Sequence, residues 1–487
     1  MFRLLRIVVA AFVCQLIVTT VAHAEVSLSA TGYRVSGTAS QVTVTVNRTG
    51  SRHGDEYVRY GTHRANAVAG IDYRNVGGTL HFLPGQTQAT FTIPIIPHDW
   101  RGPSVHAAVY LYSSYPEKLG PHNAKLFILH NAPVQVRDLA NPLELPGVPN
   151  AAGNPLAGAR FYADPHHSPA AEAARRLHRR HPKEAGLIQQ IADQPFTDRF
   201  GSWNGRTPKN SVFQFLRNAD VQDPAAIPTL ATYWIVNGQC ARGGSADPPS
   251  RIAAYEKFIN GLSDGIGNFR AVVFLEMDSI ITTPCLHGRA LAARMTELRY
   301  AVTTLENDPH VVVYLDAGAA DALSYKTAAR VLTRAGVHLA QGFFLNSTHF
   351  DWTTSEIAYG QKLARALHGA HFVVSTSDNG RGPLRPHDRV HHGNEILCGP
   401  KGRGLGPKPT SDTGYAFADA FAWIALPGKS GGSCGPGVKA PPTGAFWPAN
   451  AVGLVLNANY NVTGPSKSHL QRALEDIRRR RRPDADR

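Results

Sequence analysis

The sequence is poor in cysteine. Five cysteines occur in 487 residues, and Cys14 lies in an N-terminal apolar run. The other four form no C-x-x-C pair, and their spacing is not that of a zinc module, which argues against the rival interpretation as a metal site. An even number of cysteines in an exported chain favours two disulfides. The residues concerned are Cys240, Cys285, Cys398 and Cys434.

Only one apolar run is long, and it is typical of a secretory signal. Arg3 and Arg6 precede the apolar segment 7–21, and Ala22-His-Ala24 offers a small-residue cleavage site. The segment is short for a membrane span. We therefore expect residues 1–24 to be a signal peptide. The mature protein is expected to be secreted, either extracellular or periplasmic, to have no membrane span and to be a monomer.

Acidic residues are fewer than basic ones. Lys and Arg number 50 against 36 Asp and Glu, a formal net charge of +14. No helix-turn-helix, zinc-finger or RNA-recognition signature accompanies this excess. Part of the charge lies in a basic tail, residues 471–487, which we interpret as a solvated tail. The sequence therefore predicts no nucleic-acid partner, and anionic surface polymers are a secondary candidate.

Cofactor fingerprints are also missing. Gly428-Lys-Ser430 matches only the end of a P-loop, because Trp423 stands where its first glycine belongs. The histidines of one loop rich in Pro, Gly and Arg are more typical of exposed side chains than of metal ligands; they are His387, His391 and His392. We expect no cofactor and no metal in the C-terminal part of the chain.

Residues 25–131 alternate between apolar and polar positions with a period of two, as in Gln41-Val-Thr-Val-Thr-Val46. Turn residues separate such segments, which predicts an all-β sandwich. Ala69-Gly-Ile-Asp-Tyr73, followed by the segment 78–85, resembles the Calx-β module. Such modules can bind calcium, but Asp72 and Asp99 alone do not supply the oxygens that calcium requires. A structural or docking role is favoured, and calcium remains the alternative.

A proline-rich segment, residues 132–153, is expected to be a linker. Beyond it, short apolar strands alternate with helical patterns, which favours a parallel sheet covered by helices. Seven such units predict an α/β protein, a seven-stranded parallel (β/α) barrel. The expected strands are 160–162, 230–236, 271–275, 311–315, 342–345, 372–374 and 421–424, and the clearest helices are 289–306, 326–334 and 354–368.

Polar side chains follow most of these strands. Glu276 and Asp278 end one strand, and closure of a barrel gathers all such residues on one face. The alternative for Asp278 is a helix cap. Several carboxylates without a cofactor indicate general acid–base chemistry on a neutral, polyhydroxylated substrate. The set comprises Asp164, Asn237, Gln239, Glu276, Asp278, Asp316, Asn346, Ser375 and Asp378.

From about residue 154 to 460, the chain resembles glycoside hydrolase family 6, the inverting cellobiohydrolases and endo-β-1,4-glucanases. Phe274-Leu-Glu-Met-Asp-Ser279 matches the family's I-E-P-D-S, and Tyr314-Leu-Asp-Ala-Gly318 matches Y-x-D-A-G. Further matches are the segments 154–165, 342–346 and 398–406. The resemblance implies a distorted seven-stranded barrel over residues 154–470, no cofactor and a β-1,4-glucan substrate.

The same resemblance implies residue roles. Asp278 inherits the role of the catalytic acid, and the expected disulfides are Cys240–Cys285 and Cys398–Cys434. Residues expected to bind substrate or to hold the attacking water are Tyr233, Ser245, Glu276, Asn346, Lys429 and Trp447.

The departures from the family concern the catalytic base. Gly431 occupies the position of the proposed base aspartate, and Lys429 that of a glutamate near the sugar. Asp378 stands where the family has arginine, so Asp378 or Asp316 is the candidate replacement base. The leading hypothesis is a hydrolase. The alternatives are a degenerate relative that binds polysaccharide without cleaving it and, more weakly, an adhesion protein.

Overall fold

The computed structural model describes residues 25–50, 53–63, 65, 67–97, 104–116, 118–129, 153–205, 207–235, 244–383, 399–432 and 439–465. The chain forms two compact units that divide at residue 135. The predicted signal 1–24, nearly all of the predicted linker 132–153 and the tail 471–487 lie outside the described residues. Within those residues, no helix is long and apolar enough to cross a membrane.

The first unit is a sandwich of two mainly antiparallel sheets, as the alternating pattern predicted. One sheet has the order β6-β3-β1-β8 and the other β2-β9-β7-β4-β5. Buried positions recur every second residue in β7, at Val105, Ala107, Val109 and Leu111. The strands are β1 Glu25–Leu28, β2 Gly32–Ser36, β3 Gln41–Thr49, β4 Glu56–His63, β5 Gly77–Phe82, β6 Gln88–Pro94, β7 Val105–Tyr115, β8 Lys118–Leu119 and β9 Asn123–Leu129.

The calcium alternative for this unit depends on Asp72 and Asp99. Asp72 is fully buried, and its Oδ2 accepts a hydrogen bond from the backbone N–H of Val68 at 2.7 Å. Asp99 lies outside the described residues. Calcium binding by the sandwich therefore stays a prediction.

The second unit is built on seven parallel strands that follow one another in chain order. They are β10 Asp198–Gly201, β11 Thr229–Tyr233, β12 Ala271–Leu275, β13 Val311–Asp316, β14 Gly342–Leu345, β15 His371–Ser375 and β16 Ala418–Ala422. The order begins at β10 and ends at β16, so the barrel is open between these strands. Across this seam, Thr197 N donates a hydrogen bond to Trp423 O at 3.0 Å. The predicted seven-stranded barrel is confirmed in this distorted form.

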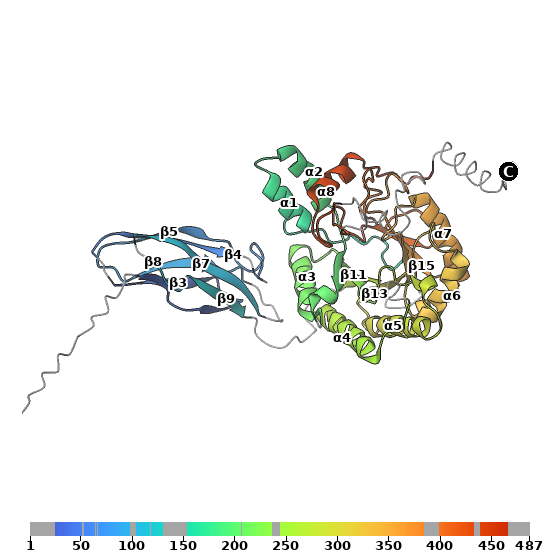
Figure 1. Cartoon of the computed structure of the whole chain (residues 1–487), viewed down its shortest axis with the longest axis horizontal. Helices are drawn as coiled ribbons and strands as arrows, with labels where there is room; N and C mark the ends of the chain where they lie inside the picture. Colours follow the sequence, from blue (N-terminus) through green and yellow to red (C-terminus); the bar gives the residue numbers. More distant parts are fainter. Residues whose placement is uncertain are drawn as a thin grey trace, which may run out of the picture. The chain divides into compact units, whose positions relative to one another are not determined.

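Helices α3 to α7 surround the curled sheet (Figure 1). The helices are α1 Pro169–Leu177, α2 Pro182–Ala192, α3 Lys209–Gln222, α4 Pro249–Ile266, α5 Gly288–Glu306, α6 Tyr325–Ala335, α7 Thr353–Ala366 and α8 Pro448–Leu456. Their ends follow local chemistry. The Ser324 side chain caps α6 by accepting from Thr327 N, and Gly336 ends that helix with φ 91°.

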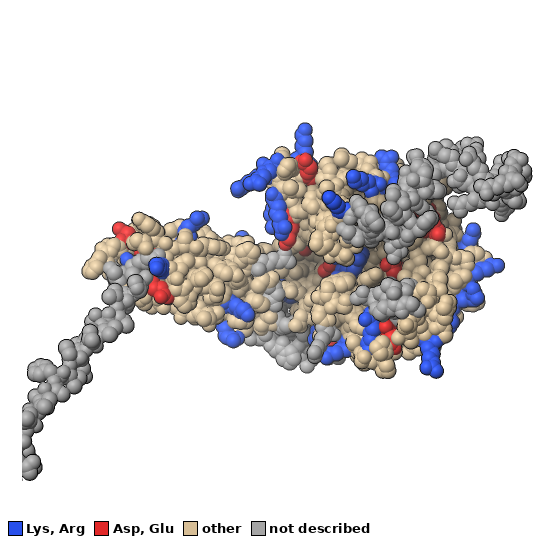
Figure 2. Space-filling model, viewed as in Figure 1, with Lys and Arg blue, Asp and Glu red and all other residues tan. Residues whose placement is uncertain are grey.

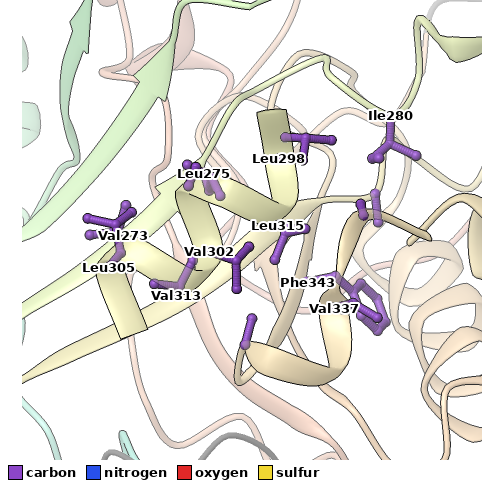
Figure 3. Packing of buried hydrophobic residues seen from close by; sticks show 14 of the residues in the cluster. Val273, Leu275, Ile280, Leu298, Val302, Leu305, Val313, Leu315, Val337 and Phe343 are labelled. Atoms are coloured by element: carbon purple, nitrogen blue, oxygen red, sulfur yellow. The ribbon is translucent and has the colours of Figure 1, made fainter. Parts of the chain in front are cut away.

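Alternate residues of each strand belong to two separate cores. Phe274 of β12 and Tyr314 of β13 lie in the core enclosed by the sheet. Leu275 and Leu315 lie in the core between sheet and helices. Figure 3 shows part of that outer core, where α5 places Leu298, Val302 and Leu305 against β12 and β13. Burial of both faces explains why the strands are almost continuously apolar.

One predicted strand was wrong, one strand of the sheet was missed, and one was displaced by a few residues. Residues 160–162 form only an isolated bridge between Phe161 and Ile227. The first strand of the sheet is β10, which contains two charged residues and therefore lacks an apolar pattern. The last strand, expected at 421–424, lies at Ala418–Ala422.

Candidate active site

The loop after β12 presents Asp278 at the carboxyl end of the sheet. Glu276 and Asp278 have positive φ angles of 55° and 66°, a left-handed conformation that is costly for residues other than glycine. Buried Arg294 supports the loop by donating a hydrogen bond from Nη1 to Ser279 O at 2.8 Å. Strained residues held by buried contacts are common at functional sites.

Asp278 is half-buried rather than part of the core. Its Oδ1 accepts a hydrogen bond from Thr348 Oγ1 at 2.6 Å. Burial raises the pKa of Asp278, and this effect exceeds the opposing effects of the Thr348 hydrogen bond and the charges of His349 and Arg199. A half-buried carboxyl with a raised pKa is suited to donate a proton.

Asp316, at the end of β13, is the buried neighbour of Asp278. Its side chain is 1% exposed, and its Oδ2 and Oδ1 accept backbone hydrogen bonds from Ile280 N at 2.9 Å and Gly318 N at 3.2 Å. Burial, followed by the charge of Asp278, raises the pKa of Asp316 to about 7. The two carboxyl groups therefore titrate as a coupled pair.

Tyr233 and Arg199 lie close to this pair from the neighbouring strands. Tyr233 ends β11 and is half-buried, and burial together with the charge of Asp278 raises its pKa to about 12. Arg199 of β10 is also half-buried, and Asp278 is the leading charge that favours its protonated form. Tyr233 thus lies near the candidate acid, and its expected role in binding substrate stays a prediction.

Two predicted substrate-binding residues are instead structural. Glu276 is fully buried, and its Oε2 accepts hydrogen bonds from Trp234 N and Ile235 N at 2.8 and 2.9 Å. Asn346 is 1% exposed and bridges two loops through the backbones of Asp351 and Ser375. Neither side chain is accessible to a sugar, because each is buried and hydrogen-bonded to backbone groups at the ends of neighbouring strands.

The other predicted residues are more accessible. Lys429 and Trp447 are both half-buried. Their backbone segments are neighbours, because Lys429 and Phe446 form an isolated β-bridge and Trp447 N donates a hydrogen bond to Gly428 O at 2.7 Å. Ser245 is exposed in the segment between β11 and α4. Asp378 is half-buried after β15, and burial raises its pKa to about 7, against the influence of Arg403. Asn237 and Gln239 lie outside the described residues.

Cys285 forms a disulfide. Its expected partner Cys240, like Cys398 and Cys434, lies outside the described residues, so both pairings remain predictions. The same holds for the environment of the histidine cluster formed by His387, His391 and His392.

One group of acids in the described part of the chain resembles a cation site. Asp321, Asp351 and Glu356 each place an oxygen within 4.8 Å of the others. Asp321 is already hydrogen-bonded to His349 at 2.9 Å, and Glu356 accepts from Ala320 N at 3.0 Å. Three carboxylates provide half or fewer of the ligands that calcium takes, and we assign no metal to them.

Three residues that the sequence did not indicate, Thr348, His349 and Arg199, lie near Asp278, and a fourth, Asp198, lies beside Arg199. Thr348 and His349 follow Asn346 in a loop without a distinctive motif, and Asp198 and Arg199 lie on the unrecognised strand β10. The one signal in the sequence that could have indicated β10 was the adjacent charged pair Asp198-Arg199, a few residues before Trp203.

In Figure 2 the second unit is hollowed over the sheet, and basic and acidic side chains lie on the floor of this hollow.

An open parallel barrel with coupled carboxyl groups at its strand ends defines the class of acid–base hydrolases that act on glycans. The family model "Glycosyl hydrolases family 6" matches residues 156–458, and the model "Calx-beta domain" matches residues 22–130. The chain therefore belongs to glycosyl hydrolase family 6 and is a glycosidase with an N-terminal Calx-beta domain.

Relatives support this assignment. The chain is 32% identical over 301 residues to endoglucanase 1 of Streptomyces halstedii, covering 61% of this chain and 88% of that protein. It is 30% identical to endoglucanase A of Cellulomonas fimi, covering 57% of each protein. The endoglucanase Cel6 of Mycobacterium tuberculosis, solved with a thio-linked cellobioside, is 34% identical with a TM-score of 0.55, covering 63% of this chain and 99% of that one.

Proposed function

We propose that the protein is a secreted glycoside hydrolase that cleaves β-1,4-glucan with inversion. The observation that carries this proposal is the pairing of half-buried Asp278 with buried Asp316 in a family 6 barrel. The endoglucanases among its relatives support the substrate class. Secretion is supported by the N-terminal apolar segment and its cleavage site.

In this mechanism, Asp278 is the general acid and protonates the glycosidic oxygen as the bond to the leaving sugar breaks. Two backbone N–H groups donate to Asp316 and oppose the burial that raises its pKa to about 7. When the coupled pair holds one proton, these donors favour the charge on Asp316 and the proton on Asp278, which passes it to the substrate. Asp316 itself is too deeply buried to activate a water molecule.

Asp378 is the proposed base, because Gly431, at the position of the family's proposed base aspartate, has no side chain that could accept a proton. It is half-buried, has a pKa of about 7 and forms no hydrogen bond within the described residues. A carboxylate of this kind can take a proton from the water that attacks the anomeric carbon. An inverting pair of carboxyls lies about 6.5–9.5 Å apart, and β12 and β15 are separated by the two strands β13 and β14 in the curled sheet.

The alternative is a protein that binds polysaccharide without cleaving it. One observation favours it: Asp278 is not among the charges that shift the pKa of Asp378, so these two carboxyls are farther apart than Asp278 and Asp316. Loss of an effective base would leave a cleft that recognises glycan but turns it over slowly.

The test incubates the mature protein with cello-oligosaccharides and β-glucans and follows the anomeric configuration of the products by NMR. We expect α-configured products from the wild type. Asp278→Asn should lower kcat by about 10²–10⁴-fold and still bind the oligosaccharide. Asp412→Asn, which changes an exposed carboxyl, is the matched control.

The base is tested separately with Asp378→Asn. Its kcat should fall by about 10²-fold or more and recover with azide, which attacks without losing a proton. Full activity of Asp378→Asn would exclude it as the base. Binding without product release by the wild type would establish the alternative.

A further inference from the structure

We propose that the cleft beside Asp278 recognises an anionic substituent, a carboxylate or a sulfate, on a β-1,4-linked glycan. This inference rests on the proposed function, because it narrows the substrate class of the same site. It is based on two basic residues at the seam of the barrel, Arg199 and Lys429.

Arg199 and Lys429 come from opposite edges of the open sheet. Arg199 lies on β10, paired in register with Ala231 of β11, and Lys429 lies in the segment that follows β16. The hydrogen bond from Thr197 N to Trp423 O brings these edges together. The charge of Arg199 contributes to a lowered pKa of Lys429, after the larger effect of burial, so the two cations lie near each other.

Neither cation is held in a direct ion pair within the described residues. Both side chains are half-buried, and within the described residues neither the guanidinium nor the ammonium group forms a hydrogen bond or an ion pair. Asp198 is the acid close to both. It pairs with neither side chain, and its Oδ1 accepts a hydrogen bond from Arg199 N at 2.9 Å. Asp198, and for Arg199 also Asp278, acts on these cations through its charge without a direct contact. An anion bound directly between two partly desolvated cations would therefore add favourable contacts that the protein does not supply.

The position of these cations connects them with catalysis. Among the charged groups, Asp278 has the largest effect on the pKa of Arg199, and Tyr233 has the next largest. An anionic group bound by Arg199 therefore belongs to a sugar next to the bond that Asp278 protonates. Before it donates its proton, Asp278 is neutral, so Arg199 can bind the substituent of the incoming glycan. The planar guanidinium suits the bidentate geometry of carboxylate and sulfate.

The test measures binding by calorimetry in the Asp278→Asn background, which prevents hydrolysis. Three hexasaccharides of equal length are compared: cellohexaose, its C6-carboxylated form and its C6-sulfated form. We expect at least one anionic form to bind about tenfold more tightly than cellohexaose, the gain from one charge-assisted contact. Comparison of the two anionic forms identifies the substituent.

Lys429→Met and Arg199→Met, made separately in the same background, should each reduce this preference about tenfold. Lys183→Met, which removes an exposed charge on α2, should leave it unchanged. Circular dichroism establishes that each variant is folded, and either seam variant alone suffices for the test.

Equal affinity for neutral and anionic hexasaccharides would overturn the inference. A loss of preference in Lys183→Met as large as in Lys429→Met would also overturn it, since it would indicate diffuse attraction to a basic protein. Cleavage of cellohexaose by the wild type with no gain from either anion would leave the proposed function intact. If none of the three glycans binds, the inference and the proposed function fail together.

Discussion

Asp278 and Asp316 are two interacting carboxyl groups, so the protonation of each depends on the other. Both are removed from water, which raises the pKa of each, and they are close enough to interact. The hydrogen bonds are unequal: Asp316 accepts from two backbone N–H groups and Asp278 from one hydroxyl. Backbone donors cannot rotate away, so they oppose the burial that raises the pKa of Asp316 to about 7. When the pair holds one proton, they favour its location on Asp278.

Asp316→Asn tests this division of roles. Activity requires protonated Asp278, so it falls as pH rises through the pKa of Asp278. Asparagine removes the neighbouring charge, which lowers that pKa and should shift the alkaline limb of kcat/KM against pH about one unit toward acid. Asp412→Asn should leave the limb in place. An unchanged limb in Asp316→Asn would show that the two carboxyls do not interact during catalysis.

At the scale of elements, the strands that are apolar throughout were predicted well. Residues 271–275 and 342–345 coincide with β12 and β14, and the expected helix 289–306 differs from α5 by one residue. Strand β10 was missed because it begins with Asp198 and Arg199 and lies at an edge of the sheet. An edge strand at an open seam can carry charged side chains that face the cleft. Such charges remove the apolar pattern by which a strand is predicted from sequence.

The site was predicted only in part for a related reason. Sequence places Glu276, Asp278, Asp316 and Asn346 at strand ends, but it does not show which of them faces the cleft. Positive φ angles at Glu276, Asp278 and Asn346 end the alternation of side chains between the two faces of the sheet. The period of two therefore cannot predict where these side chains point. Thr348 reaches Asp278 from another loop, a contact set by tertiary packing.

Glu306, at the end of α5, offers a test of how that helix is joined to the sheet. Its Oε1 accepts a hydrogen bond from Val313 N of β13 at 3.0 Å, and burial raises its pKa from 4.5 to about 8. Between these values the folded state binds more protons than the unfolded state. The free energy of unfolding therefore falls as pH rises from about 4.5 to 8.

Glu306→Gln should make this decline shallower, because glutamine accepts the same hydrogen bond without a charge. Above pH 8 the variant should be more stable than the wild type by on the order of 1–3 kcal/mol. Urea unfolding at several pH values measures the difference, with Asp412→Asn as the control. A variant less stable than the wild type at every pH would contradict this account of α5.

At the scale of the whole molecule, the two units have separate hydrophobic cores. The core of the sandwich draws its buried residues from Val26 to Ile128, and the cores of the barrel begin at Leu156. No buried cluster in the described residues combines the two. Each unit therefore contains the apolar contacts needed for its own cooperative unfolding.

A chain shortened to residues 153–487 should accordingly fold and should hydrolyse soluble cello-oligosaccharides with a kcat close to that of the full-length protein. Calorimetry of the full-length protein should show two transitions, one of which persists in the shortened chain at a similar temperature. This follows because Asp278, Asp316 and Asp378, with their hydrogen-bonding and charged neighbours, all lie within the barrel. A single transition in the full-length protein, together with loss of turnover in the shortened chain, would mean that the barrel needs the sandwich for its stability.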